Sequence, residues 1–392
     1  MSTWLQKYIV NPRLVTLYII YHLSISFVTV LPLFYDGSSI IAKVAVPTSF
    51  LVLRELLFMS IMGGFVILTS ELSALLTASI LILLLSLTVA VVAGIDSYYL
   101  MGIKSLLPVL ILFLWPAKNR QIISLQHFSW TKIIKGILVV NLFFQTLHLF
   151  FGAGYYAKLA TGLNARNPGL MYYPAATAIF ILVLFAAYLK ENKKTKISWI
   201  SLFVLSIFMC SSLTGIIGLL LLFVHRFYLS FDKIKIRKFL LISILVFPGL
   251  LFLHFARSSM NGPVYYLESS SARLNIFKKA ISTIQLLPQK FGYFTNIAAQ
   301  GEKGFMPDSF YTAFMGNLGI IWSIIMGLFL IYGFIRNIQT KQDLLFIWLF
   351  LIGSFSMNMT ETGVTMLLIV LFKSRYAESH TDGQGLHVNS AA

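Results

Sequence analysis

Three arginines in the polar stretches of this largely apolar chain have the chemistry needed to hold phosphate. They are Arg166, Arg257 and Arg273. A guanidinium group is planar and donates paired hydrogen bonds, so it binds two phosphate oxygens at once. These residues predict an anionic substrate. Contact with lipid headgroups is the alternative, and it is favoured for four lysines: Lys43, Lys158, Lys290 and Lys303.

Two carboxylates stand where a general base could act. Asp308 comes just before a long apolar run, and Glu361 lies in a polar turn between two short ones. Ionisable groups at membrane depth are costly and mark function by default. Desolvation raises the pKa of a carboxylate and makes it a better base near neutral pH. For each carboxylate, the alternative to the role of base is a salt bridge with a nearby arginine. Arg54 and Glu55 could pair with each other or hold neighbouring hairpins.

The composition is that of a membrane protein. Of 392 residues, 58% are hydrophobic and only 11% are charged, whereas soluble proteins carry about 25% charged residues. The mean hydropathy is +0.84. We predict an all-α polytopic membrane protein with about 12 transmembrane or part-spanning helices. The apolar runs are residues 14–34, 51–70, 73–95, 101–115, 133–153, 173–188, 199–210, 215–224, 239–255, 310–335, 344–355 and 364–372.

Basic residues predict which loops face the cytoplasm. They gather in short cytoplasmic loops, here at residues 7–13, 118–135, 190–196, 225–238, 336–341 and 373–375. The stretches 199–224 and 344–372 have basic residues at both ends, so each must enter the membrane and return. We predict turns at 211–215 and 357–363, with arms of about 10–13 residues that cross only part of the membrane. Irregular backbone at that depth is buried in protein or lines a wet cavity, which predicts a cavity open to the outer side.

The chain is predicted to form one transmembrane domain at residues 1–378, followed by a disordered polar tail at 379–392. Its two notable outer loops are residues 154–172 and 257–309. The first apolar run, 14–34, is longer than the apolar core of a signal peptide and has no cleavage site after it. We therefore expect it to remain as the first span.

The second outer loop is predicted to contain an amphipathic helix. Ser271 can cap its start and Pro288 ends it. One face carries the apolar residues Leu274, Phe277, Ile281 and Ile284. Such a helix lies on the membrane surface, and it would hold Arg273 at the depth of a lipid phosphate.

Several classes are excluded by what the sequence lacks. The net charge of +17 would suggest nucleic acid in a soluble protein, but basic cytoplasmic loops explain it here. There is no nucleotide-binding Gly-rich motif ending in Lys and Ser or Thr. The seven histidines lack metal-ligand spacing, so neither a metal nor another cofactor is expected. Lipid-phosphate-sugar mannosyltransferases usually carry paired acids in the first outer loop, where only Asp36 occurs.

A characteristic order of residue types follows in the second outer loop and the next span. It consists of Arg273, Phe277, Pro288 with Gly292, Asp308-Ser309-Phe310-Tyr311, and Gly319 within Asn317-Leu318-Gly319-Ile320. This order resembles bacterial O-antigen polymerases of the Wzy type and the related O-antigen ligases. Three further stretches resemble features of that family: Arg166-Asn167-Pro168, Ser211-Ser212-Leu213-Thr214-Gly215 and Thr360-Glu361.

The resemblance implies a metal-independent glycosyltransferase of the membrane-embedded C type. Its donor is a growing glycan on undecaprenyl diphosphate, and its acceptor is one lipid-linked repeat unit at the periplasmic face of the bacterial inner membrane. Asp308 or Glu361 is implied to take the proton of the attacking hydroxyl. Residues implied to hold the diphosphate are Arg166, Arg257, Arg273, Lys104 and Tyr311, with Arg273 also catalytic. A chain-length regulator and a flippase are implied partners.

Two alternatives remain open. An O-antigen ligase would transfer finished glycan to the lipid A core, but ligases usually carry a periplasmic His where this chain has Asp308-Ser309. A transporter of lipid-linked glycans would usually show two repeated halves, and the sequence has no convincing internal repeat. The surface polysaccharide of a deletion strain discriminates between a polymerase and a ligase.

Overall fold

The computed structural model describes residues 12–30, 47–69, 72–114, 130–151, 169–171, 174–191, 196–210, 212–229, 275, 278, 281–295, 309–337 and 341–374. Within these ranges there are the eleven α-helices and one short 3-10 helix named below, further helical residues at 275, 278 and 281–283, and no strand. The all-α prediction is therefore confirmed for the described residues. The helices are α2 (Pro12–Val30), α4 (Thr48–Thr69), α5 (Leu72–Val92), α6 (Tyr99–Leu114), α8 (Trp130–Phe151), α10 (Pro174–Glu191), α11 (Ile197–Met209), α12 (Leu213–Leu229), α16 (Phe310–Asn337), α17 (Lys341–Ser356), η2 (Met359–Glu361) and α18 (Gly363–Ser374).

Eleven of the twelve predicted apolar segments correspond to one of these α-helices. The segment 239–255 and the polar tail lie outside the described residues. Within the described part of the chain, two helices are long and apolar enough to cross a membrane, namely Pro174–Glu191 and Phe310–Ile335. The total number of crossings stays a prediction.

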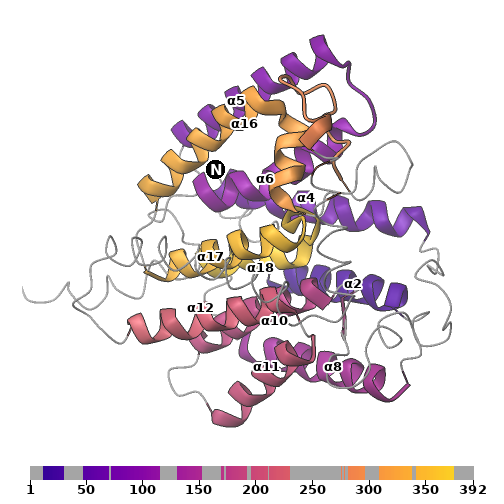
Figure 1. Ribbon diagram of the computed structural model, residues 1–392, viewed down its shortest axis with the longest axis vertical. Coiled ribbons are helices and arrows are strands. Elements are labelled where there is room, and N and C mark those ends of the chain that lie inside the picture. The colour runs from indigo at the N-terminus through magenta and orange to yellow at the C-terminus, as the bar shows by residue number, and fades with distance from the viewer. Residues whose placement is uncertain are drawn as a thin grey trace, which may run out of the picture.

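Helix α10 is the centre of the hydrophobic core. Its side chains at residues 176–188 are all buried, and the helix packs against α8, α11, α12, α17 and α18. Figure 1 shows α17 and α18 above it and α8 and α11 below it. The ring of Phe185 stacks on Phe203 of α11, with centroids 4.8 Å apart. A helix that is apolar on every side is stable only when other elements surround it.

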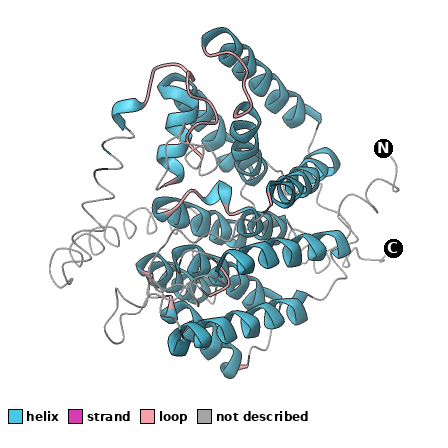
Figure 2. Cartoon of the chain, turned by 90° about the vertical axis from the view of Figure 1, so that its right-hand side faces the viewer, coloured by secondary structure: helices cyan, strands magenta, loops and turns pink. Residues whose placement is uncertain are grey.

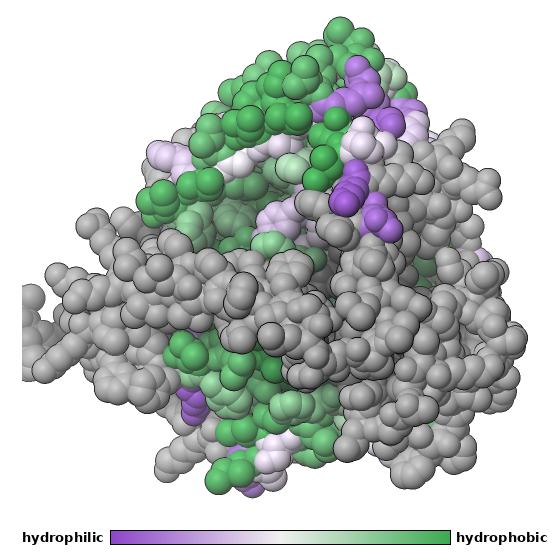
Figure 3. Space-filling view, in the orientation of Figure 1, coloured by the Kyte–Doolittle hydropathy of each residue, from purple (hydrophilic) through white to green (hydrophobic). Residues whose placement is uncertain are grey.

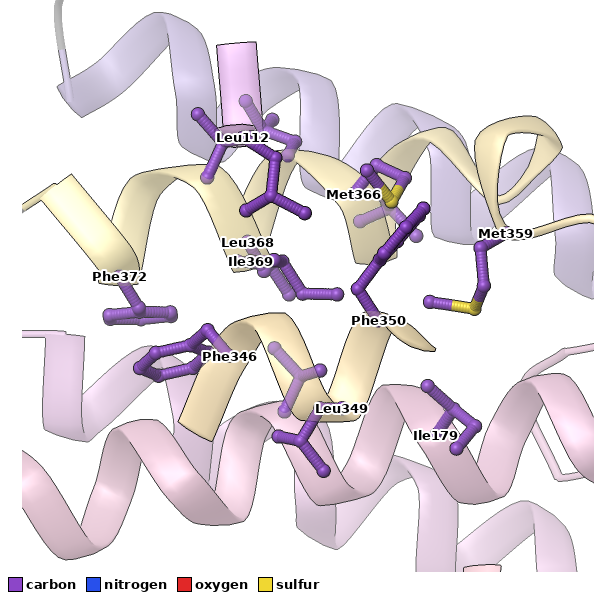
Figure 4. Close-up of a cluster of buried hydrophobic side chains, with 14 of the residues drawn as sticks. Leu112, Ile179, Phe346, Leu349, Phe350, Met359, Met366, Leu368, Ile369 and Phe372 are labelled. Carbon is purple, nitrogen blue, oxygen red and sulfur yellow. The ribbon is translucent and has the colours of Figure 1, made fainter. Parts of the chain in front are cut away.

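The hairpin formed by α17 and α18 also contributes to this core. Phe346 and Phe372, one from each arm, stack near its open end (Figure 4). At the other end Met359 folds back over Gly353, where a Cβ atom would lie 2.6 Å from the Met359 sulfur. The glycine therefore lets the turn close tightly on the helix.

Both predicted hairpin turns lie between helices. Helix α11 ends at Met209 and α12 begins at Leu213, while α17 ends at Ser356 and α18 begins at Gly363. The predicted arm length was wrong for α12 and α17, which have 17 and 16 residues. Both helices continue past their apolar run into polar residues, so each arm is about 25 Å long and close to the roughly 30 Å of a bilayer core.

Lys135 contacts two aromatic rings, so that the ends of three helices lie together on one side of the molecule. The Nζ of Lys135, near the start of α8, lies 5.7 Å from the ring centroid of Tyr188 and 4.8 Å from that of Trp199. Tyr188 is near the end of α10, and Trp199 is near the start of α11. Successive helices therefore run in opposite directions here, as the basic loops predict.

The outer helices expose large apolar side chains. On α5, Leu83 and Leu87 are 59% and 54% exposed, and on α16, Ile324 and Leu328 are 58% and 64% exposed. The space-filling view shows a broad apolar surface over these two helices (Figure 3). Soluble monomers rarely expose contiguous apolar patches beyond a few hundred Å². A surface of this kind is typical of contact with lipid.

Candidate functional site

The predicted site residues fall into two groups. Arg166, Arg257, Arg273 and Asp308 lie outside the described residues, so their predicted roles stay predictions. Lys104 on α6 and Tyr311 on α16 are described with their side chains, and Glu361 is described as the last residue of η2.

Lys104 belongs to a cluster of three ionised groups, which we call the charge cluster: Arg54, Glu55 and Lys104. The Glu55 Oε1 atom lies 2.5 Å from Arg54 Nη2 and 2.9 Å from Arg54 Nε. The Oε2 atom of the same carboxylate pairs with the Lys104 ammonium. The side chains of Arg54, Glu55 and Lys104 are 20%, 14% and 8% exposed. Two cations and one anion leave this mostly buried cluster with a net charge of +1.

The local sequence explains how the cluster forms. Arg54 and Glu55 are adjacent on α4, and adjacent residues on a helix do not face each other, so the long arginine side chain must turn back to reach its neighbour. Lys104 comes from α6, which packs directly against α4. Each oxygen of one carboxylate thus takes one cation, and Glu55 bridges the two helices. The pairing of Arg54 with Glu55 was one of the two predicted options.

A buried tyrosine and histidine on α2 lie beside the charge cluster. The Tyr18 hydroxyl is 3.3 Å from His22 Nδ1, and the two residues are 1% and 6% exposed. Helix α2, which carries both residues, packs against α4. Neither residue was predicted as part of the site, although His22 is an ionisable group inside the apolar run 14–34, and such groups are functional candidates by default.

The tip of the α17–α18 hairpin packs onto the same region. Helix η2 contacts α6. A Cβ atom at Gly363 would lie 2.7 Å from the Tyr18 hydroxyl and 3.3 Å from the Phe58 ring. The backbone that carries Glu361 therefore lies close to the helices that hold the charge cluster. In Figure 2 the described part of the chain consists of helices and loops, with no strand.

Helix α16 is broken at Gly319, a residue singled out in the sequence. Its φ and ψ are 70° and 172°, so the helical hydrogen bonds are interrupted there. The Ile320 amide donates instead to the Gln285 carbonyl at 3.0 Å, and the Ile321 amide donates to the Leu286 carbonyl at 3.1 Å. A Cβ atom at Gly319 would lie 2.7 Å from the Leu287 carbonyl carbon. The segment 285–287 thus replaces the missing helical partners.

Asn317 holds the next part of the same loop. Its Oδ1 accepts the Gly292 amide at 2.9 Å and the Phe294 amide at 3.0 Å. Gly292 has a φ of 86°, and a Cβ atom there would lie 1.9 Å from the Tyr98 carbonyl oxygen. Only glycine fits this position. The Pro-x-x-x-Gly step and the Asn317–Gly319 step are separated in the sequence, but these hydrogen bonds hold them together as one packed unit.

The loop is also tied to the start of α6. Asp96 Oδ1 accepts the Tyr98 and Tyr99 amides at 2.9 and 3.2 Å, which caps the helix. Its Oδ2 accepts the Tyr293 hydroxyl at 2.5 Å, and this hydrogen bond to the carboxylate raises the pKa of Tyr293. The helix that carries Lys104 is therefore fixed at its first turn.

Tyr311 contacts α17. Its hydroxyl donates to the Leu351 carbonyl at 3.3 Å, and its ring centroid lies 4.7 Å from that of Phe355. The Phe310 amide donates to the Met357 carbonyl at 3.1 Å. In this arrangement Tyr311 anchors the start of α16 to the hairpin, and its predicted contact with a diphosphate stays a prediction.

Among the described residues, no group of three or more His, Cys, Asp and Glu side chains could hold a metal ion. Comparison with protein-family models, with curated proteins and with solved structures finds no match for this chain.

Proposed function

We propose that the chain is a multi-pass protein of the bacterial inner membrane, with about 12 transmembrane or part-spanning helices and a site that faces the periplasm. The exposed apolar side chains of α5 and α16 support contact with lipid. The broken helix at Gly319 supports a membrane site as well, because irregular backbone at membrane depth occurs where it is buried in protein or lines a cavity.

The proposed activity is the polymerisation of lipid-linked oligosaccharide repeat units. The growing glycan leaves undecaprenyl diphosphate and is transferred to the non-reducing end sugar of a new lipid-linked unit. A hydroxyl of that sugar attacks the first carbon of the donor glycan and forms the new glycosidic bond. The bond between that carbon and the diphosphate oxygen breaks, and the electron pair leaves with the diphosphate. Asp308 or Glu361 takes the hydroxyl proton.

The observation that carries this proposal is the net positive charge of the charge cluster. Arg54 and Lys104 lie near the first turns of α4 and α6, the ends that the basic loops predict to face outward. The leaving diphosphate gains negative charge as the sugar bond breaks, and fixed cations in a mostly buried site stabilise that charge most effectively. Arg166, Arg257 and Arg273 would complete the set of cations around the diphosphate.

A deletion strain tests the proposal. If the chain is the polymerase, the strain makes surface polysaccharide that carries single repeat units and no long chains. Loss of a ligase would instead leave long polymer on undecaprenyl diphosphate. Normal long-chain polysaccharide on the cell surface would contradict the proposed function.

Transport of lipid-linked glycan is the second candidate, and the broken helix α16 is the observation that favours it. Interrupted helices are common at the substrate sites of transporters. A transporter moves lipid-linked units without joining them, so purified protein would form no glycosidic bond.

A further inference from the structure

Glu55 occupies the position between Arg54 and Lys104 that an anionic ligand would take. One of its oxygens contacts the guanidinium and the other contacts the ammonium. Phosphate oxygens make the same contacts with these two groups. The carboxylate is therefore the internal equivalent of a phosphate in this cluster.

Arg54 and Lys104 differ in how accessible they are to a ligand. Arg54 is 20% exposed and still has donor groups beyond those that face Glu55. Lys104 is 8% exposed and is paired with Glu55. A phosphate that binds the Lys104 ammonium directly must therefore displace the Glu55 carboxylate from it.

We propose that Glu55 competes with the lipid diphosphate for Arg54 and Lys104, an inference that rests on the proposed function. Between turnovers the carboxylate holds both cations, which would otherwise be buried next to each other without an anion, at a large cost. When the diphosphate binds, Glu55 gives up the cations. When the reaction is over, Glu55 takes them back and so speeds the release of undecaprenyl diphosphate.

The substitution Glu55→Gln tests this competition, because glutamine keeps the shape of the side chain and removes its charge. The cluster then carries a net charge of +2, and the competing anion is gone. We expect inorganic pyrophosphate, measured by calorimetry on the purified full-length protein, to bind at least about tenfold more tightly than to the wild type. In polymerisation assays KM and kcat should both fall, because product release becomes slower.

A purely structural role for Glu55 predicts a different result. Loss of the bridge between α4 and α6 would lower thermal stability and raise KM, with no gain in pyrophosphate affinity. Unchanged or weaker pyrophosphate binding by Glu55→Gln would therefore overturn the proposal. Glu55→Asp keeps the charge but shortens its reach, and it should tighten binding by a smaller factor, so the idea stays testable if Glu55→Gln does not fold. Glu191→Gln at the end of α10 makes the same change of charge elsewhere and should leave binding unchanged.

The outcome also separates this inference from the proposed function. If the wild type joins repeat units but Glu55→Gln binds pyrophosphate no more tightly, the competition is refuted and the polymerase proposal stands. If Glu55→Gln binds pyrophosphate more tightly but the wild type joins no repeat units, the competition for anions stands and the polymerase proposal fails.

Discussion

The ammonium of Lys104 on α6 pairs with the carboxylate of Glu55 on α4, in a region where both side chains are mostly buried. The pair joins two helices through one carboxylate that also holds Arg54. Because α4 and α6 both pack against the α17–α18 hairpin and α6 also contacts the loop at 285–295 through Tyr99 and Phe291, this contact lies at the junction of the parts that we propose to form the site.

Removal of the shared carboxylate should cost more stability than removal of one of its two cations. Lys104→Met leaves Glu55 with one cation and should lower the free energy of unfolding by about 3 kcal/mol, near the lower end for a broken buried pair. Glu55→Gln leaves Arg54 and Lys104 buried without an anion and should lower the free energy of unfolding further, while Lys104→Met should abolish polymerisation because the cation is absent. Thermal unfolding in detergent and chain-length analysis in cells measure the two effects. A Glu55→Gln variant that is as stable as Lys104→Met, or more stable, would contradict the shared ion pair.

The break in α16 can be tested with two glycines on the same helix. Gly319→Ala places a Cβ against the Leu287 carbonyl at a φ of 70°, so little folded protein should reach the membrane. Gly327→Ala is the matched control, since nothing lies within 4 Å of its Cβ position and alanine favours a helix by about 1 kcal/mol over glycine. Immunoblots of membrane fractions compare the two. Equal amounts of both variants would show that α16 is not broken at Gly319.

The contact between Tyr293 and Asp96 predicts a dependence on pH. The carboxylate raises the pKa of Tyr293 in the folded protein, so the contact stabilises the fold fully below the ordinary tyrosine pKa of about 10. This contribution is lost as the pH rises through the raised pKa. Tyr293→Phe should therefore unfold at a lower temperature than the wild type at pH 7, and the difference should shrink at pH 11. A difference of the same size at both pH values would rule out this coupling.

The two candidate bases can be separated by substitutions that remove only the charge. Asp308→Asn or Glu361→Gln should abolish nearly all polymerisation if the altered residue accepts the hydroxyl proton, and the other variant should keep substantial activity. Chain length of the polysaccharide and the amount of protein in the membrane are measured together. Full activity in both variants would exclude both carboxylates as the base.

The helices themselves could be predicted because long apolar runs separated by basic loops leave few alternatives. The two hairpin turns followed from the same logic, as the breaks after Met209 and Ser356 confirm. The lengths of α12 and α17 could not be read from hydropathy, because hydrogen bonding carries a helix beyond its apolar residues. The break at Gly319 could not be predicted from the sequence either. The position of this glycine inside a span was noted, but the break depends on hydrogen bonds to the segment 285–287.

The charge cluster was predicted only in part. Adjacent Arg54 and Glu55 suggested a pair, whereas the link from Glu55 to Lys104 requires the packing of α4 on α6, which no local pattern specifies. Asn317 was part of a sequence motif, but its two bonds to the loop at Gly292 and Phe294 join residues far apart in the chain. Polar residues in apolar runs therefore indicated the residues of the charge cluster correctly. Their contact partners could be identified only from the folded structure.

Polymerase activity is tested most directly by purified protein in liposomes with synthetic undecaprenyl-diphosphate-linked repeat units. The wild type should convert single units into a ladder of longer glycans and release undecaprenyl diphosphate, with no loss of rate in EDTA. Arg273→Ala and Lys104→Met should form no ladder. Folded wild-type protein that leaves the repeat units unjoined, with all of its substrate still as single units, would contradict the account.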